Sequence, residues 1–386
     1  MNAFEPRLPD LPVRRVEEMG LKELERIRLI LRGGSVIEWR RLHFRTRDEV
    51  DRFLRLCLFD PANPVDEAWM RTVLGDAVAY LRKTFDYQVA EAVANPKEIH
   101  DLFLYASGTK EPARHRRIAC IVLKVMHVIQ HIEGRELLFR LDVPEAEIAE
   151  IVARRVTSMV QEMTTKGIPI VEFELSFKTR ESLITKLLAK KETVAAQIYD
   201  KTRFRIVTQT RKDILPALYY LTQRLFPFNF VVPGQTENSL IEFKDLLAEY
   251  PNFAAHAEQL HLHTDYEREA PEHRGKNSFS AKNYKVLNFV VDVPIRLDAY
   301  LPTPEEDKRE RKNRLGFGLV EFQIVDQPTA ISNEQGEASH ERYKHRQKIQ
   351  VLRRLSRGLV VPRPAEHRHK KRKKAASPTN GSGSHS

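Results

Sequence analysis

Cysteine, tryptophan and long apolar runs are scarce in this chain of 386 residues. The two cysteines, Cys57 and Cys120, lie far apart in the sequence, which excludes a disulfide framework and a zinc site built from several cysteines. The best apolar stretch, 119–129, is interrupted by Lys124 and His127 and falls far short of the ~20 residues that a membrane span needs. The N-terminus has prolines and acids where a signal peptide needs an apolar segment, so we expect a cytoplasmic protein with no membrane partner.

A strong overall charge is also missing once the C-terminal tail is set aside. The formal charge is +11, from 64 Lys and Arg against 53 Asp and Glu. Residues 352–374 contain ten basic residues and one acid, so they carry +9 of that total. A body close to neutrality excludes a histone-like protein whose whole surface binds phosphate. The tail could bind RNA, DNA or an anionic surface through phosphate attraction, and a merely solvated tail is the alternative.

The spacing of apolar residues divides the chain into a helical part and a mixed part. A proline-rich, extended leader at 1–14 precedes a mostly helical N-terminal domain at 15–142, where apolar residues recur every three or four positions. From 143 to 351, strand-like and helical segments alternate, which is typical of an α/β or α+β sheet domain. This domain holds a polar insertion at about 237–276, and a basic, disordered tail at 352–386 follows it.

The same spacing predicts the individual elements. We expect helices at 16–31, 48–58, 66–94, 97–106, 113–132, 144–165, 180–191, 213–225 and 331–355. We expect strands at 35–44, 168–177, 195–207, 228–232, 288–293, 295–300 and 318–325.

One candidate for phosphate binding lies where an expected strand enters a helix. Lys178 stands at the turn, and Ser182 and Lys186 are four residues apart, so they share one helix face. The N–H groups at a helix start and two lysines suit a polyphosphate. Solvated lysines on a surface helix are the alternative.

Two expected strands carry carboxylates. Asp200 lies in an apolar, strand-forming stretch, where an aspartate is costly to bury unless it is paired or binds a metal. Arg203 and Arg205 have the same parity and so point to one strand face, as do Glu321 and Gln323. On neighbouring strands, Asp200 and Glu321 could hold Mg²⁺ between them and a triphosphate. An edge-strand aspartate paired with an arginine is the alternative.

A tyrosine between lysines is a candidate for base recognition. Tyr284 follows Lys282 and precedes Lys285, so its ring could stack on a nucleobase while the lysines contact phosphate. An ordinary surface tyrosine is the alternative.

Taken in chain order, these segments resemble the synthetase domain of the RelA/SpoT family, the (p)ppGpp synthetases or GTP pyrophosphokinases. They are similar to the family patterns RxKxxxSxxxK, DxxGxRI, KxNGY, EIQI and AExGxAAHWxYK, over roughly residues 145–347. The residues that match are Lys178, Ser182, Lys186, Asp200, Arg205, Ile206, Lys282, Asn283, Tyr284, Glu321, Phe322, Gln323, Ile324, Glu334, Gly336, Ala338, His340, Tyr343 and Lys344. Three positions carry another residue: Ser176, Arg203 and Asn288 stand where the family has arginine, glycine and histidine. The glycine that precedes the tyrosine in the family is also absent or displaced here.

The resemblance implies an α+β fold of the nucleotidyltransferase type, with a mixed sheet and the helical domain before it. It implies transfer of pyrophosphate from ATP to the 3′-hydroxyl of a guanosine nucleotide or another ribose, with Mg²⁺ as cofactor. Asp200 and Glu321 would bind the metal and act in catalysis. The nucleotide-binding residues would be Lys178, Ser182, Lys186, Arg205, Lys282, Tyr284, Gln323 and His340.

Two alternatives to this activity stay open. Because Ser176 and Asn288 depart from the pattern, the domain could be catalytically inactive and only bind a nucleotide or RNA. Alternatively, the enzyme could use RNA, such as tRNA, as the acceptor, with the basic tail as its electrostatic anchor.

Overall fold

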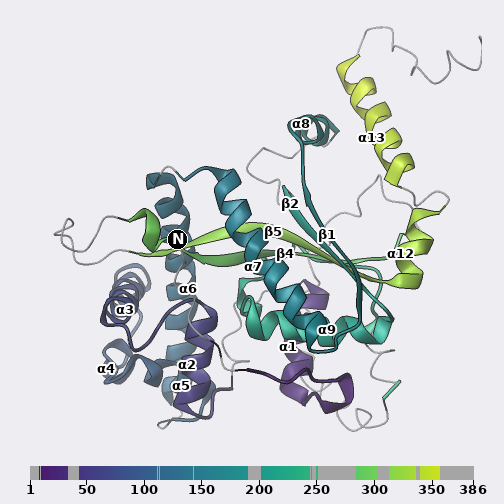
Figure 1. Cartoon of the computed structure of the whole chain (residues 1–386). Coiled ribbons are helices and arrows are strands. Elements are labelled where there is room, and N and C mark those ends of the chain that lie inside the picture. The colour runs from purple at the N-terminus through teal and green to yellow at the C-terminus, as the bar shows by residue number, and fades with distance from the viewer. Residues whose placement is uncertain are drawn as a thin grey trace, which may run out of the picture.

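The structure is a computed structural model that describes residues 10–33, 43–110, 114–141, 143–189, 201–243, 284–301, 313–335 and 340–356, with a few single positions beside these ranges. The described residues form an α+β fold, in which a five-stranded mixed sheet is flanked by helices (Figure 1). The expected fold class is therefore confirmed. None of the described helices is long and apolar enough to cross a membrane.

Apart from the first of them, the N-terminal helices gather beside one end of the sheet (Figure 1). They are α1 (Leu21–Arg32), α2 (Arg47–Leu56), α3 (Pro64–Phe85), α4 (Glu91–Ala94), α5 (Ile99–Ser107) and α6 (Arg114–Arg140). Gly33 ends α1 with a φ of +66°, a left-handed conformation that glycine adopts without strain. The single helix expected at 66–94 is wrong, because Asp86 ends α3 with a φ of +51° and an extended segment precedes α4.

The sheet has the strand order β1-β2-β5-β4-β3. Its strands are β1 (Ile170–Phe177), β2 (Thr202–Thr208), β3 (Glu237–Asn238), β4 (Leu287–Arg296) and β5 (Leu315–Asp326). β2 and β5 run parallel, whereas the other neighbouring pairs are antiparallel. The register of the parallel pair places Arg203 beside Glu321 and Arg205 beside Gln323. The strand expected at 195–207 is thus confirmed as a neighbour of the strand around Glu321 over Thr202–Thr208, whereas Asp200, expected on that strand, lies outside the described residues.

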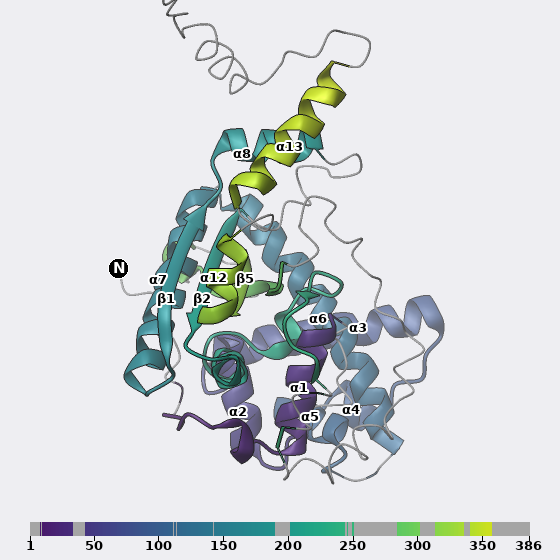
Figure 2. The ribbon, with the colours of Figure 1, turned by 90° about the vertical axis from the view of Figure 1, so that its right-hand side faces the viewer.

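The remaining helices lie around the sheet. They are α7 (Glu145–Thr165), α8 (Arg180–Ala189), α9 (Ile214–Arg224), α12 (Gln327–Glu334) and α13 (His340–Leu355). α7 packs against β1, β4 and β5, while α9 packs against α7 and β5. α12 contacts β5 and β2, and α13 packs on α8 beyond the end of the sheet (Figure 2).

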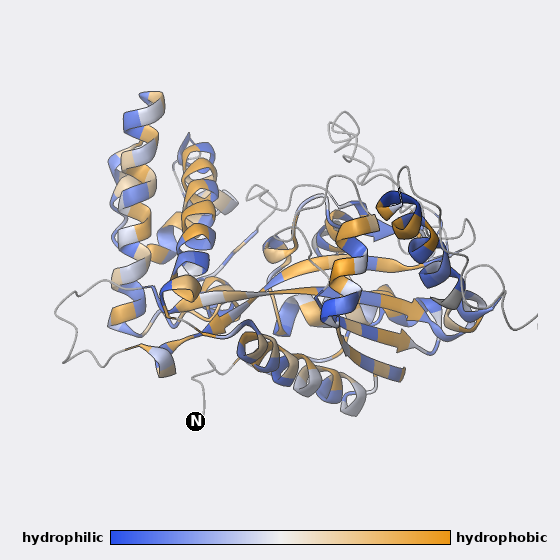
Figure 3. Ribbon diagram, turned by 90° about the horizontal axis from the view of Figure 1, so that it is seen from above, coloured by the Kyte–Doolittle hydropathy of each residue, from blue (hydrophilic) through white to orange (hydrophobic). Residues whose placement is uncertain are grey.

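One face of the sheet is aromatic, and the other is polar around Glu321 but apolar at Phe317 and Leu319 nearer the start of β5. Four phenylalanines cross the sheet on the buried face: ring centroids are 6.2 Å apart for Phe173 and Phe204, 5.4 Å for Phe204 and Phe322, and 5.5 Å for Phe322 and Phe289. Residues of the opposite parity point to the other face, so apolar and polar positions alternate along the strands (Figure 3). We call that second face of β2, β4 and β5 the polar face; it is formed by Arg203, Arg205, Asn288, Glu321 and Gln323.

The helical region and the sheet share one hydrophobic core. α6 packs along β5, and Gly134 permits this because a Cβ there would collide with the Phe317 ring and the Leu315 carbonyl. One turn earlier, the ring of His131 stacks on Phe317 at 4.3 Å. The domain boundary at 142/143 stays a prediction, but the two parts contact each other across it.

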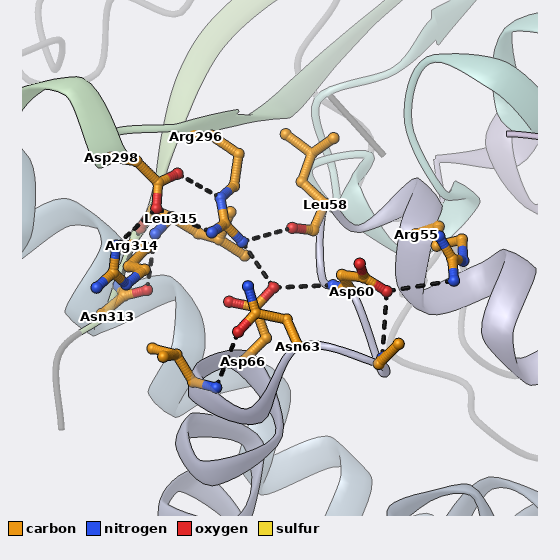
Figure 4. Close-up of polar contacts among 12 residues, drawn as sticks. Arg55, Leu58, Asp60, Asn63, Asp66, Arg296, Asp298, Asn313, Arg314 and Leu315 are labelled. Atoms are coloured by element: carbon orange, nitrogen blue, oxygen red, sulfur yellow. Dashed lines mark hydrogen bonds and ion pairs between the residues drawn. The ribbon is translucent and has the colours of Figure 1, made fainter. Parts of the chain in front are cut away.

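A buried polar network also joins the two parts (Figure 4). The guanidinium of Arg296 on β4 donates to Asp66 of α3, to the Leu58 carbonyl and to both carboxylate oxygens of Asp298, over 2.7–3.0 Å. Arg314 also donates to Asp298 at 2.8 Å. Every nitrogen of Arg296 has an acceptor. The network therefore stabilises the contact between the two parts and is not a candidate ligand-binding site.

Three further expectations about the elements are wrong. Residues 228–232 form no strand; Phe228–Phe230 is a short 3-10 helix, after which Val231 bridges to Val291. The strands expected at 288–293 and 295–300 are a single strand, β4, that passes through Pro294. The helix expected at 331–355 is two helices, α12 and α13. The strand expected at 35–44, most of the polar insertion and the tail after Ser356 lie outside the described residues.

Candidate functional site

Glu321 is the centre of the polar face. It projects from the middle of β5, and its side chain is only 6% exposed. Arg203 on β2 donates from Nε to Oε2 at 2.8 Å, and Asn288 on β4 donates from Nδ2 to Oε1. Each oxygen of this carboxylate therefore accepts a hydrogen bond from a different neighbouring strand.

The electrostatics of Glu321 favour its ionised form. Burial acts to raise the pKa of the carboxyl group, but the charge of Arg203 and the hydrogen bonds from Asn288 and Arg203 outweigh it. Lys178 adds a further attraction, and the resulting pKa lies below the ordinary 4.5. Burial likewise acts to lower the pKa of Arg203, yet Glu321 holds it above the ordinary value. Both groups are thus charged at neutral pH.

Lys178, just after the end of β1, lies near enough to this carboxylate to lower its pKa. Its backbone N–H donates to the Lys201 carbonyl at 2.9 Å, which fixes the turn between β1 and α8 beside the start of β2. The side chain is half-buried and attracts Glu321 electrostatically. The structure therefore brings together Lys178 and Glu321, two of the residues that the sequence singled out.

Tyr284 and Gln323 form a second part of the site, next to Glu321. Gln323 Nε2 donates to the hydroxyl oxygen of Tyr284 at 2.8 Å. Burial raises the pKa of this hydroxyl above the ordinary 10.0, although Arg203 and Arg205 act in the opposite direction. Asn333 of α12 holds the adjacent chain, since its side chain bonds both the N–H and the carbonyl of Lys285. Tyr284 is half-buried, and stacking on a base stays a prediction.

Arg205 lies on the same face, two residues after Arg203. Its guanidinium is 3.5 Å from the carboxylate of Glu334 at the end of α12. Its Nε is buried and has no hydrogen-bond partner among the described residues. Tyr343 of α13 also lies near enough to influence the pKa of Arg203. The cations of the polar face are therefore bordered by α12 and α13.

The expected phosphate residues on α8 are placed less centrally. Ser182 is exposed, and its backbone N–H and hydroxyl both contact Thr179 Oγ1 at 3.3 Å, a cap at the start of the helix. Lys186 is half-buried on the helix that packs against α13. Their role in binding phosphate stays a prediction.

Three candidates cannot be placed in the site. Asp200 and Lys282 lie outside the described residues, and the side chain of His340, which begins α13, is also outside them.

The part of the chain that the structure describes contains no group of three potential ligands that could hold a metal. The described residues alone do not make a Mg²⁺ site, since no three potential ligands come together in them and both oxygens of Glu321 already accept hydrogen bonds.

Sequence reasoning did not include Arg203 and Asn288 among the site residues, although they are the two that bind Glu321. They are also two of the three positions at which the chain departs from the RelA/SpoT pattern. The parity of Arg203 with Arg205 was the available signal for one of them. No signal in the sequence places Asn288 on the strand adjacent to Glu321.

No family model matches the sequence, and no curated protein matches it. Among solved structures, the chain is similar to small alarmone synthetase 1 from Bacillus subtilis, with 15% identity and a TM-score of 0.29 over 62% of this chain and 98% of that one. It is similar to the same synthetase bound to its product pppGpp, with 16% identity and a TM-score of 0.30 over 63% and 100% of the two chains.

A GTP pyrophosphokinase family protein from Streptococcus pneumoniae is similar at 13% identity and a TM-score of 0.29, over 63% of this chain and 94% of that one. These structures are of the kind that the motifs resemble. At such identities and TM-scores the likeness says nothing about activity, so the argument for function depends on the polar face itself.

Proposed function

We propose that the chain is a nucleotide pyrophosphokinase-like transferase that binds its nucleotides on the polar face. The observation that supports this best is a buried, ionised carboxylate, Glu321, which is paired with Arg203 and attracted by Lys178, with Arg205 two residues further along β2. A triphosphate needs several fixed cations, and transfer to a hydroxyl needs an acceptor for its proton. Both kinds of group occur here on adjacent strands.

The proposed roles follow from the positions of the side chains. Lys178 and Arg205 neutralise phosphate oxygens of ATP, assisted by Lys186, Ser182 and the N-terminus of α8. Glu321 orients the 3′-hydroxyl of the acceptor, a guanosine nucleotide or another ribose, and accepts its proton. Tyr284 stacks on the acceptor base, with its hydroxyl positioned by Gln323. Lys282 and His340 complete the nucleotide contacts.

Mg²⁺ is part of this proposal, with Asp200 as the second carboxylate beside Glu321. The metal would neutralise phosphate charge when bound. The Mg²⁺ site depends on Asp200, because the described residues bring no three potential metal ligands together.

A specific observation favours a second candidate function. Arg203 neutralises Glu321 at 2.8 Å, and a carboxylate held in an ion pair is a weaker proton acceptor than an unpaired one. If this pair persists with nucleotide bound, the domain binds nucleotide without transferring pyrophosphate.

One experiment separates these functions. The full chain is incubated with Mg²⁺ and ATP labelled on the γ-phosphate, in the presence of GDP, GTP or tRNA, and the products are separated. We expect the label on the acceptor, equimolar AMP, and loss of both with Glu321→Gln but not with the control Glu67→Gln on the exposed surface of α3. ATP binding without transfer would indicate the inactive domain. Absence of both binding and transfer would contradict the proposal.

A further inference from the structure

We infer that Arg203 exchanges partners when a nucleoside polyphosphate binds: it leaves Glu321 and contacts a phosphate oxygen, so that the carboxylate becomes available to the acceptor hydroxyl. This inference rests on the proposed nucleotide site and states how that site is switched on. Arg203 then both binds phosphate and controls Glu321.

The first argument is the depth of the two groups. The side chain of Arg203 is 30% exposed, whereas that of Glu321 is 6% exposed. The guanidinium therefore lies on the solvent side of the carboxylate, and an anion that approaches the polar face meets Arg203 before Glu321. A planar guanidinium also binds phosphate in two-point fashion as well as it binds a carboxylate.

The second argument is that Glu321 keeps partners when Arg203 leaves. Asn288 Nδ2 remains hydrogen-bonded to Oε1, and Lys178 remains close enough to attract the charge. Leaving a buried carboxylate with no partner would be strongly unfavourable, but a neutral hydrogen bond and a nearby cation reduce that penalty. The exchange therefore does not leave the buried charge of Glu321 without partners.

The third argument is that Arg203 and Arg205 already point to the same region. They are two residues apart on β2, so both side chains leave the same face. Arg205 is held by Glu334 rather than by Glu321. A phosphate chain that lies along β2 can therefore contact both arginines, and Arg203 is the one whose movement changes the partners of Glu321.

A double-mutant cycle in ATP affinity tests this inference, with Arg203→Met, Glu321→Gln and the double variant of the full chain. If the pair breaks on binding, Glu321→Gln removes a partner that Arg203 would have to leave. ATP affinity is measured by calorimetry without Mg²⁺. We expect Glu321→Gln to tighten ATP binding in the parent about tenfold more than it does in the Arg203→Met background. This tenfold difference corresponds to a coupling energy of about 1.4 kcal/mol between the two residues. If the pair persists, the two changes are additive.

Two controls make the result specific. Adenosine, which has no phosphate, should give additive changes in every variant. Arg205→Met combined with Glu321→Gln should also be additive for ATP, since those two side chains are not paired with each other. Should Arg203→Met fail to fold, as judged by its melting curve, Arg203→Gln takes its place in the cycle.

The outcomes distinguish the inference from the proposed function. ATP binding with additive effects at 203 and 321 overturns the partner exchange and leaves the nucleotide site intact. A parent chain that does not bind ATP overturns both.

Discussion

The guanidinium of Arg296 on β4 donates to the carboxylate of Asp66 on α3 at 2.8 Å, and the side chains of both residues are at most 4% exposed. The two residues belong to parts of the chain that the sequence assigns to different domains. Their contact is buried, charged and specific in geometry, so it fixes the N-terminal helices against the sheet.

Removal of the N-terminal region tests how far the sheet depends on it. From the sequence, a chain beginning near Val143 should fold by itself and keep ATP binding. In the structure this truncation removes Asp66, the Leu58 carbonyl and all of α6, which exposes Phe317 and leaves Arg296 with Asp298 alone. We therefore expect the truncated chain to aggregate, as measured by size-exclusion chromatography. A monodisperse product with a cooperative melt would support the sequence-based boundary instead.

Replacement of Asp66 tests the buried ion pair directly. Asp66→Asn leaves Arg296 undercompensated in a buried place, so we expect a loss of about 3 kcal/mol in the free energy of unfolding, at the low end for buried pairs because Asp298 remains. Denaturant unfolding measures this. The neighbouring Glu67 is 42% exposed and pairs with Arg71 one turn away, so Glu67→Gln should change stability by less than about 0.5 kcal/mol. Equal effects of the two variants would show that the network contributes nothing particular.

Two helical glycines give a matched pair for close packing. A Cβ at Gly134 on α6 would collide with Phe317, whereas a Cβ at Gly75 on α3 meets nothing within 4 Å. We expect Gly134→Ala to destabilise the chain by about 1–3 kcal/mol through overpacking. Gly75→Ala should stabilise it by up to about 1 kcal/mol, because alanine is the better helix former. Thermal melts of both variants decide the matter, and stabilisation by Gly134→Ala would mean that α6 and β5 do not approach so closely.

A histidine pair at the same junction predicts acid sensitivity. Burial, with a small effect of His131, holds the pKa of His127 well below the ordinary 6.5. Burial also lowers the pKa of His131, against the opposing attraction of Asp292. The unfolded chain binds protons at these residues below pH 6.5 while the folded chain does not, so stability falls as the pH drops through that value.

The melting temperature should therefore fall between pH 7.5 and pH 5.5, and His127→Gln should reduce that fall. Burial raises the pKa of Asp292 despite His131 and Arg135, so this carboxyl group acts on stability in the opposite direction. His345→Gln, which removes an exposed histidine of α13 away from this junction, supplies the control. A melting temperature that is constant over this range would contradict the assignment.

Deletion of residues 357–386 tests the role of the basic tail. This segment contains eight basic residues, one acid and no aromatic residue, so it can attract phosphate but cannot stack on bases. We expect the deletion to weaken RNA binding and flatten its salt dependence, measured by titration at several salt concentrations, without changing the melting temperature. Loss of folding or of ATP binding would show that the tail is part of the body.

Local sequence signals predicted the elements that have clear boundaries. α7 was predicted almost to the residue, since Pro144 precedes it and Lys166 and Gly167 follow it. Pro294 wrongly divided β4, because proline is usually excluded from central strands. β3 pairs only with Leu287 and Asn288 of β4. Among the described residues, β4 therefore has only β5 as a neighbouring strand at Pro294. The N–H group that Pro294 lacks thus removes no hydrogen bond from the sheet.

The site was only partly predictable for a different reason. Strand parity predicted that Glu321 and Gln323 share one face of their strand. It predicted the same of Arg203 and Arg205 on theirs. The pairing between β2 and β5 agrees with both predictions. The partner of Glu321 could not be inferred, because pairing between β2 and β5 joins residues 118 positions apart. Which of several nearby charges contact one another is decided by tertiary structure.

The aromatic face and the polar face are built from alternating residues of the same strands. Replacing one residue of β2 therefore alters either the core or the site. Inserting one residue into β2 would alter both, since Phe204 would turn outward and Arg203 or Arg205 would turn inward. The chemistry of this face can thus be changed by point substitution, whereas changes of length must be confined to the connections between strands.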